Sequence, residues 1–556
     1  MGMETVAVLL ATFGSTLLFV LTISNAGPLW RDEVNTINLA QMPTLHDLWH
    51  NQPFESFPSL YPLLLRFCGF AGLAGSDVDI RLLGFYVGFL VLGSFWLCAR
   101  WLGGRAPTLS LGLIGFLPPF LFIVGANRAY GLATFLLIMS FASLWRMVQK
   151  PSWGRIVLAA VCCLLFAHCV YYDVVFLAGM LAGGALVAWR RRQWGTLGWL
   201  TGIGAVSAGS LAIYWPIIRA GSVYVPLMQW PYFTAWTLFS RAAGAVTARE
   251  TGETGHAGLE LLVWIALVIG GVAVAVLAQR KRPPAVAVNQ PEPAATAAAR
   301  DEVADRALYC ATSMVLGVAG YIAFLYHLHY WTQPWYYVEM FCLCGVALDG
   351  MLGANWSSLR PWGWLRITFM LAMIGCYARA AWTEAHTRRS DLDLVAAVLT
   401  KYAAEGDLIV VHSVWEGITF NRYYHGPAKW ETIPPVSSHL VHRNDMVTRD
   451  LRDPNTMAPV LNEAMQTLQN GHTIWYVGNM SAERPQPPES NEATQWCGTF
   501  FPYWNAQMSA LVLDHATKEE IIDLPLDEPV CNFENLPVTR FEGYRSGSRT
   551  NSAAGK

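Results

Sequence analysis

Long apolar runs recur along this chain and restrict its fold more than any other feature of the sequence. A helix needs about 17 to 25 apolar residues to cross the hydrocarbon of a bilayer. The predicted spans are 5–25, 82–100, 107–125, 129–147, 155–172, 174–189, 195–216, 259–278, 307–325, 336–352 and 364–382. With 54% hydrophobic and only 14% charged residues, the chain has the composition of a polytopic membrane protein and not of a soluble enzyme.

Small basic clusters predict how these eleven spans are oriented. They fall on every second connection, which the positive-inside rule assigns to the cytoplasm. The clusters are Arg100/Arg105, Arg146/Lys150/Arg155, Arg190/Arg191/Arg192, Arg280/Lys281/Arg282 and Arg360. The N-terminus is then inside, and the other loops are extracytoplasmic, on the periplasmic side of the inner (plasma) membrane. A net charge of -2 gives no indication of a nucleic-acid partner.

Three segments modify this simple alternation. The apolar stretch 57–75 contains Arg66 and would reverse the topology if it crossed, so we expect an interfacial helix there. The first span lacks a basic n-region and an obvious cleavage site, which favours a retained anchor over a signal peptide. Residues 280–306 are rich in Pro and Ala, which is typical of a cytoplasmic linker.

The composition changes after the last span and predicts a second domain. Residues 1–382 form the expected transmembrane domain, and residues 383–556 form an extracytoplasmic α/β domain in which helical and strand-like runs alternate. Cys497 and Cys531 fall in this second domain, where an oxidising compartment would allow them to pair. The sequence alone leaves that pairing open.

The first outer loop holds an acidic pair, Asp32 and Glu33, at the point where the chain leaves the bilayer. Burial at that depth would raise the pKa of a carboxyl toward the range of a general base, which could deprotonate an acceptor hydroxyl. A leaving group would need nearby cations or donors, and Arg81, Arg128 and His168 lie at outer ends of other spans. Ionisable residues at such positions are candidates for function because their insertion is costly.

Three motifs on the same side of the membrane carry a family resemblance. They are the "DE" pair at 32–33, "PSLY" from Pro58 to Tyr61 and "RAYGL" from Arg128 to Leu132. In this order they resemble the GT-C membrane glycosyltransferases that use polyprenyl-phosphate sugars, a group that includes the protein O-mannosyltransferases and the lipid A aminoarabinose transferase. The resemblance covers roughly the first 350 residues.

The resemblance implies an enzyme, a hexosyl or pentosyl transferase, that acts with inversion on a lipid, glycan or protein acceptor of the cell envelope. Asp32 would be the catalytic base with Glu33 beside it. The donor phosphate would be bound by Arg128 and Tyr130, with Arg81 and His168 as further donors. Candidates for contact with the acceptor or substrate are Glu55, Tyr61, Trp335 and Tyr336.

The chain also departs from the family pattern. Relatives often have an acid shortly before the Arg of "R-x-Y", whereas this chain has Ala126 and Asn127, and Trp335 replaces a common Arg. No metal ligand is therefore assigned and no cofactor is certain, although a divalent metal stays possible. His327 and His329 could share a ligand face only if they lay in a strand.

Two alternatives of other classes stay open. A secondary transporter should show inverted repeats and interrupted helices around a midplane site, whereas the charges here gather at one membrane surface. A non-enzymatic envelope protein could use its outer domain to bind a partner, but eleven spans exceed what an anchor needs.

Overall fold

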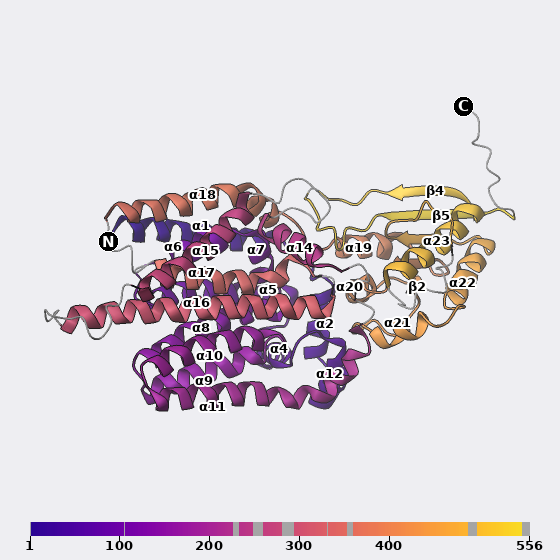
Figure 1. Ribbon diagram of the computed structural model, residues 1–556. Helices are drawn as coiled ribbons and strands as arrows, with labels where there is room; N and C mark the ends of the chain where they lie inside the picture. Colours follow the sequence, from indigo (N-terminus) through magenta and orange to yellow (C-terminus); the bar gives the residue numbers. More distant parts are fainter. Residues whose placement is uncertain are drawn as a thin grey trace.

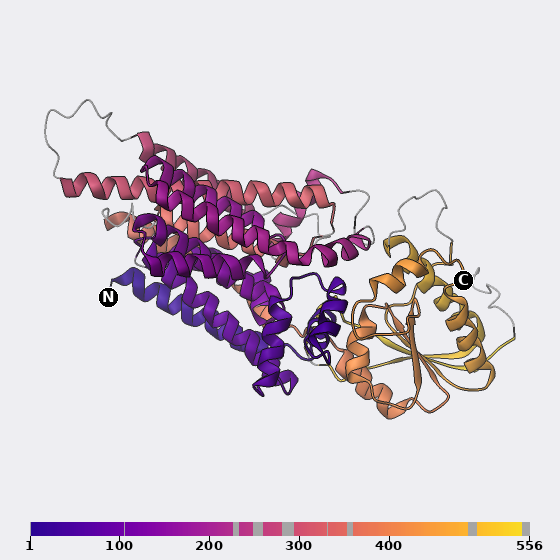
Figure 2. The same cartoon turned by 90° about the horizontal axis from the view of Figure 1, so that it is seen from below.

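The computed structural model describes residues 2–104, 106–225, 229, 233–247, 259–280, 294–330, 332–352, 360–486, 497–526 and 528–546. A bundle of long helices occupies one end of the molecule and an α/β domain occupies the other, with short helices at the junction (Figures 1 and 2). This arrangement confirms the expected fold class of a helical membrane domain followed by a small C-terminal sheet.

The bundle contains a helix for every predicted span. Its helices are α1 (Met3–Asn25), α5 (Asp77–Trp101), α6 (Thr108–Ile114), α7 (Pro118–Gly125), α8 (Ala129–Gln149), α9 (Trp153–Ala167), α10 (Asp173–Arg190), α11 (Trp194–Ser210), η2 (Leu211–Tyr214), α12 (Trp215–Ser222), α14 (Ala235–Thr247), α15 (Leu259–Arg280), α16 (Ala294–Leu328), η3 (Pro334–Tyr337), α17 (Val338–Leu352) and α18 (Arg360–Ala385). In the part of the chain that the structure describes, eight helices are long and apolar enough to cross a membrane. The helix α9 has only 15 residues.

One predicted span is not a straight helix. The segment 107–125 forms α6 and α7, which are bent by 87° at the break between them. Pro118 and Pro119 begin α7, and proline cannot continue a preceding helix because it lacks the N–H and clashes with the previous turn. All of α17 is buried, so this helix lies in the middle of the bundle.

The linker prediction at 280–306 also needs a correction in its second half. The helix α16 begins at Ala294, ahead of the predicted span start at 307. Asp305 on this extension pairs with Arg190 and with Arg191 at the end of α10, which explains why a charged segment continues the helix. Residues 281–293 lie outside the described part of the chain.

Short helices connect the bundle to the second domain. They are α2 (Arg31–Ala40), α3 (Leu45–Asn51), η1 (Gln52–Phe54) and α4 (Leu60–Phe70). Capping boxes begin two helices, with Thr44 and Asp47 at α3 and Ser76 and Asp79 at α5. The helix α4 has 11 residues, too few to span a bilayer, which agrees with the interfacial prediction for 57–75.

The α/β domain has a five-stranded sheet between two helical layers. Its elements are α19 (Leu392–Tyr402), β1 (Leu408–His412), α20 (Glu416–Tyr423), β2 (Lys429–Ile433), α21 (Asn444–Asp450), α22 (Ala458–Gln469), β3 (Ile474–Val477), α23 (Cys497–His515), β4 (Ala516–Ile522) and β5 (Val538–Tyr544). The strand order is β2-β1-β3-β5-β4; the first three strands are parallel, and β5 and β4 are antiparallel additions.

Both faces of the central strands are buried, as their continuous apolar sequences indicate. Leu408 and Val410 pack with α21, α22 and α23, while Ile409 and Val411 pack with α19 and α20. Cys531 is a free thiol. The side chain of Cys497 lies outside the described residues, and so does the pairing of the two cysteines.

Candidate active site

A cavity of about 620 Å³ lies where the helical bundle meets the α/β domain. Its size is within the range of small-molecule sites, about 300 to 1,000 Å³. The bundle side contributes α2, η1, α8 and η3, and the other side contributes loops of the α/β domain. Among the lining residues are Arg31, Asp32, Phe54, Glu55, Arg128, Tyr171, Tyr330, Trp335, Tyr336, Trp415, His442, Asn444 and Phe533.

Asp32 lies in the first turn of α2, where the helix dipole favours a negative charge. Two arginines and a histidine surround its carboxylate: Arg128 Nη2 at 3.9 Å, His442 Nε2 at 3.3 Å and Arg31 Nε at 3.8 Å. Burial opposes ionisation, but Arg128, His442 and Arg31 together outweigh it and lower the pKa of Asp32. The expected upward shift is therefore wrong for Asp32, which stays ionised at neutral pH.

Arg128 stands at the N-cap of α8 and is almost fully buried. Its Nη1 donates to the backbone oxygen of Asp32 at 2.8 Å and to Thr36 Oγ1 at 2.6 Å. The guanidinium lies over the ring of Phe57, 4.4 Å from its centroid, a contact that favours a cation. These contacts fix Arg128 beside Asp32, as the sequence predicts, and leave its other face toward the cavity.

Glu55 is a second carboxylate in the same cavity. It lies 3.0 Å from Arg128 Nη1 and accepts hydrogen bonds from Thr36 Oγ1 at 2.7 Å and from Asn35 Nδ2 at 3.0 Å. The family pattern led us to look for this acid just before Arg128, where the chain has none. The fold instead brings an acid from the loop that follows η1.

Glu33 and Arg81 lie together but outside the cavity wall. Arg81 Nη1 donates to Glu33 Oε1 at 2.6 Å, and the Asn127 backbone N–H donates to the same oxygen at 2.8 Å. The second carboxylate oxygen of Glu33 accepts from the Trp30 N–H, and this hydrogen bond lies at the start of α2. Both charged side chains are buried, so this geometry indicates a structural pair that holds α2 against α5.

Three other candidates also lie behind the cavity surface. Tyr130 packs edge-on against Phe57, with ring centroids 4.9 Å apart, and supports the ring on which Arg128 rests. Tyr61 is 1% exposed. His168 is held by the Tyr214 hydroxyl at 3.1 Å and by Ser210 Oγ at 2.9 Å, and it does not line the cavity.

Aromatic rings form the wall opposite the charged groups. Trp335 stacks on Phe122 with centroids 4.7 Å apart and meets the edge of Phe533 at 5.3 Å. Tyr336 lies beside it and also lines the cavity. A flat, rigid aromatic surface that lines a cavity is suited to packing against a sugar ring or an isoprenoid chain.

The α/β domain contributes residues that the sequence did not single out. His442 contacts Asp32, and its backbone N–H donates to Asn35 Oδ1 at 2.8 Å. Trp415 packs edge-on against the His442 ring at 5.6 Å. Nothing in the local sequence around His442 marks it as a site residue, because its role depends on contact with α2.

The aromatic segment 421–430 of the α/β domain contacts the bundle. Arg422 and Tyr423 both donate to Asp77 at the start of α5, and the Tyr423 hydroxyl accepts from the Leu29 N–H at 2.9 Å. This segment therefore fastens the α/β domain to the bundle.

The described residues contain no group of three or more His, Cys, Asp or Glu side chains placed to hold a metal ion. His329 follows the end of α16, and its ring faces Phe233 and Tyr326. The backbone oxygen of His327 accepts from the His329 ring at 3.0 Å. The two histidines do not form the shared strand face that metal binding would need.

Taken together, the fold and the site define a polytopic helical membrane protein with a polar and aromatic cavity under an α/β domain. No protein family and no curated protein matches the sequence. Among solved structures, the chain is similar to ArnT from Cupriavidus metallidurans bound to undecaprenyl phosphate, at 14% identity and a TM-score of 0.47 over 84% of this chain and 92% of that one. It is similar to the apo oligosaccharyltransferase of Archaeoglobus fulgidus at 12% identity and a TM-score of 0.47, over 94% and 75% of the two chains. A third similar structure is the mycobacterial arabinofuranosyltransferase AftD, at 14% identity and a TM-score of 0.37 over 97% and 41%.

Proposed function

We propose that this protein is a GT-C-type membrane glycosyltransferase that moves a sugar from a polyprenyl-phosphate donor to an acceptor hydroxyl, with inversion. One observation carries the proposal. An ionised carboxylate, Asp32, and an arginine with an open face, Arg128, meet in one cavity at the end of a membrane bundle. The transfer needs a base for the acceptor and a cation for the leaving phosphate, and this pair supplies both.

Asp32 is the base in this proposal. The acceptor oxygen attacks the anomeric carbon as its proton passes to the Asp32 carboxylate, and the bond from that carbon to the phosphate oxygen breaks on the opposite face. A positioned base contributes about 10² to 10⁴ in rate. The low pKa of Asp32 keeps it ionised before the reaction, so the base is always available.

Arg128 stabilises the departing phosphate. Its Nη1 is occupied by Asp32, Thr36 and Glu55, whereas its Nε has no hydrogen-bond partner in the structure although it is buried. Arginine can bind phosphate through two parallel N–H groups. Phosphate oxygens next to Nε and Nη2 would satisfy that unpaired donor.

Glu55 and the aromatic wall shape the rest of the donor site. Glu55 lies 3.0 Å from Arg128 Nη1 and limits how far the arginine can move toward the donor. Trp335 and Tyr336 offer their faces to the sugar or to the first isoprene units. Because His442 and Trp415 complete the cavity, the α/β domain takes part in the site, which argues against a separate module that only binds a partner.

The charges at the far end of the bundle support an extracytoplasmic site. The helix α8 begins beside the cavity at Arg128 and α10 begins just after Tyr171, so Arg146 and Arg191 lie at the ends of these helices away from the cavity. The positive-inside rule places that end in the cytoplasm. The cavity and the α/β domain are then extracytoplasmic, on the side where polyprenyl-phosphate sugars are used by the resembling family.

The test is a transfer assay in membranes that contain a radiolabelled polyprenyl-phosphate sugar and a total envelope acceptor fraction. We expect Asp32→Asn to lower transfer at least 100-fold at unchanged protein level. Arg128→Lys keeps the charge but loses the two-pronged geometry, so its donor concentration at half saturation should rise about tenfold. Asp445→Asn is the matched control, because Asp445 pairs with Arg443 near the cavity without lining it.

Normal transfer by Asp32→Asn would reject the base assignment. Unchanged donor saturation in Arg128→Lys would reject the phosphate assignment.

A further inference from the structure

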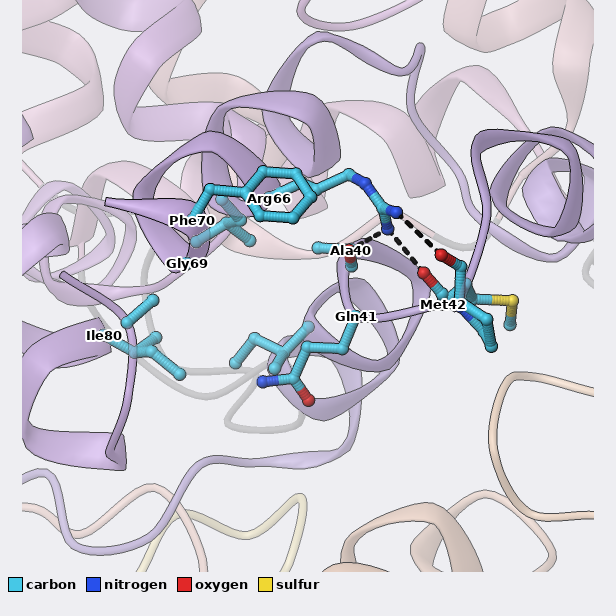
Figure 3. Close-up of a pocket in the computed structure, with 11 residues that line it drawn as sticks. Ala40, Gln41, Met42, Arg66, Gly69, Phe70 and Ile80 are labelled. Atoms are coloured by element: carbon cyan, nitrogen blue, oxygen red, sulfur yellow. Dashed lines mark hydrogen bonds between the residues drawn. The ribbon is translucent and has the colours of Figure 1, made fainter. Parts of the chain in front are cut away.

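A second cavity opens beside the C-terminal end of α2, apart from the one that contains Asp32. Its volume is about 340 Å³, and the two cavities share no lining residue. The helices α2 and α4 and the first turn of α5 enclose it (Figure 3). Its walls are mostly apolar, with contributions from Ile37, Leu65, Gly69, Phe70, Ala74 and Ile80.

Arg66 is the charged residue of this cavity. Its Nη1 donates to the backbone oxygens of Ala40 and Met42, and its Nη2 donates to the Pro43 oxygen at 3.0 Å (Figure 3). A guanidinium has five N–H donors, so two of them are not used by these three bonds. The acceptors are neutral carbonyls, which leave the positive charge uncompensated.

The carboxylates near the start of α5 are engaged elsewhere. Asp77 pairs with Arg422, and Asp79 caps its own helix through Ser76. Within the described ranges no ion pair joins Arg66 to an acid. An arginine at the rim of an apolar cavity therefore has charge and N–H donors left for an anion.

Exposed apolar side chains surround the cavity. Phe67, Phe70, Leu73 and Val78 are between 63% and 78% exposed, a patch that water would not favour and that marks a membrane or partner contact. The patch continues along the candidate span α5 in the exposed side chains of Leu82, Tyr86, Phe89 and Leu90. An occupant of this cavity would thus enter from the lipid phase.

We propose that this cavity binds a phospholipid with a net negative headgroup. An acyl chain occupies the apolar cavity, and the phosphate accepts hydrogen bonds from the two free N–H groups of Arg66. The charge selects an anionic lipid over a zwitterionic one, and the continuous apolar patch selects a lipid over a free anion. The site is independent of the proposed glycosyl transfer, because it lies at the opposite end of α2 from Asp32.

The experiment measures retained lipid on the purified full-length protein by native mass spectrometry. The probes are phosphatidylglycerol, phosphatidylcholine and inorganic phosphate. We expect one phosphatidylglycerol per protein, with phosphatidylcholine retained about tenfold more weakly and inorganic phosphate not retained. Arg66→Gln should weaken phosphatidylglycerol about tenfold, whereas Arg379→Gln, on the exposed face of α18, should not.

A second variant leaves Arg66 in place, because this arginine also holds the end of α2. Gly69 lines the cavity, and a Cβ there would meet no atom within 4 Å, so Gly69→Phe adds a ring at the cavity while Arg66 keeps its side chain. Gly93→Phe on α5 is the control, since Gly93 is equally open and distant in sequence from the cavity. We expect phosphatidylglycerol retention to fall about tenfold in Gly69→Phe alone.

Two results would overturn the proposal. One is equal retention of phosphatidylglycerol by the wild type, Arg66→Gln and Gly69→Phe. The other is retention of inorganic phosphate as strong as that of the lipid, which would indicate an anion site without an acyl-chain contribution.

Discussion

Replacing Glu33 with Gln should destabilise the protein, although the change is isosteric. Glu33 is 0% exposed and accepts from Arg81, Asn127 and Trp30. Glutamine can accept only one of the two backbone hydrogen bonds, because the Asn127 and Trp30 N–H groups donate to different oxygens of Glu33, and it leaves the buried charge of Arg81 without a counter-ion. Unit charges about 4 Å apart attract by about 4 kcal/mol at an effective dielectric constant of 20, and breaking a buried pair costs about 3 to 5 kcal/mol.

The assay is the half-life of the monodisperse protein in mild detergent at rising temperature, measured for Glu33→Gln, Asp32→Asn and the double variant Glu33→Gln/Arg81→Met. Glu33→Gln should lose the most stability, and the double variant should recover much of it because both charges are removed. Asp32→Asn should lose less stability than Glu33→Gln, since the side chain of Asp32 is 27% exposed whereas that of Glu33 is 0% exposed. A Glu33→Gln protein that is as stable as the wild type but inactive would refute this reasoning and place Glu33 in the reaction.

Three further outcomes are expected. His442→Ala should lower transfer about tenfold by removing the donor to Asp32, and His442→Gln should keep part of the transfer activity. Equal losses of transfer in the two variants would indicate a packing role for His442. Burial raises the pKa of Asp391 to about 7, above its unfolded value of about 3.9. The protonated carboxyl therefore contributes to the free energy of unfolding at low pH, and this contribution is lost as the pH rises from about 4 to about 7. The midpoint of thermal unfolding should therefore fall more between pH 5 and pH 8 in the wild type than in Asp391→Asn, and parallel curves would contradict this. His46→Cys, on the exposed surface of α3, should react with a membrane-impermeant maleimide added outside intact cells; labelling from the cytoplasmic side alone would reverse the proposed topology.

Much of the fold could be predicted from local sequence because the relevant physics is local. An apolar run of sufficient length must form a helix in a bilayer to satisfy its backbone, and each of the predicted spans lies on a helix. The break at Pro118 could have been recognised from the prolines themselves, although the bend of 87° depends on how α6 and α7 pack. In the α/β domain, the predicted alternation of helical and strand-like runs is seen in α19 and β1.

The site was predictable only in part. The sequence places Asp32 and Arg128 at the same end of the bundle, and the structure brings them within 3.9 Å. It could not show that Glu33 turns away from Asp32, because successive helical residues point about 100° apart and packing decides which of them faces the cavity. Arg81 and the buried Asn127 backbone fix that choice.

The sequence by itself determined that the chain is a multi-pass membrane protein. It also predicted that the basic ends share one side of the membrane and that an acid and an arginine lie on the other. These are consequences of composition and of short-range order. The tertiary structure alone decided that Glu55 supplies the second acid and that His442, 410 residues from its partner, reaches Asp32. Contacts of that range depend on the packing of whole segments, which no local pattern of residues encodes.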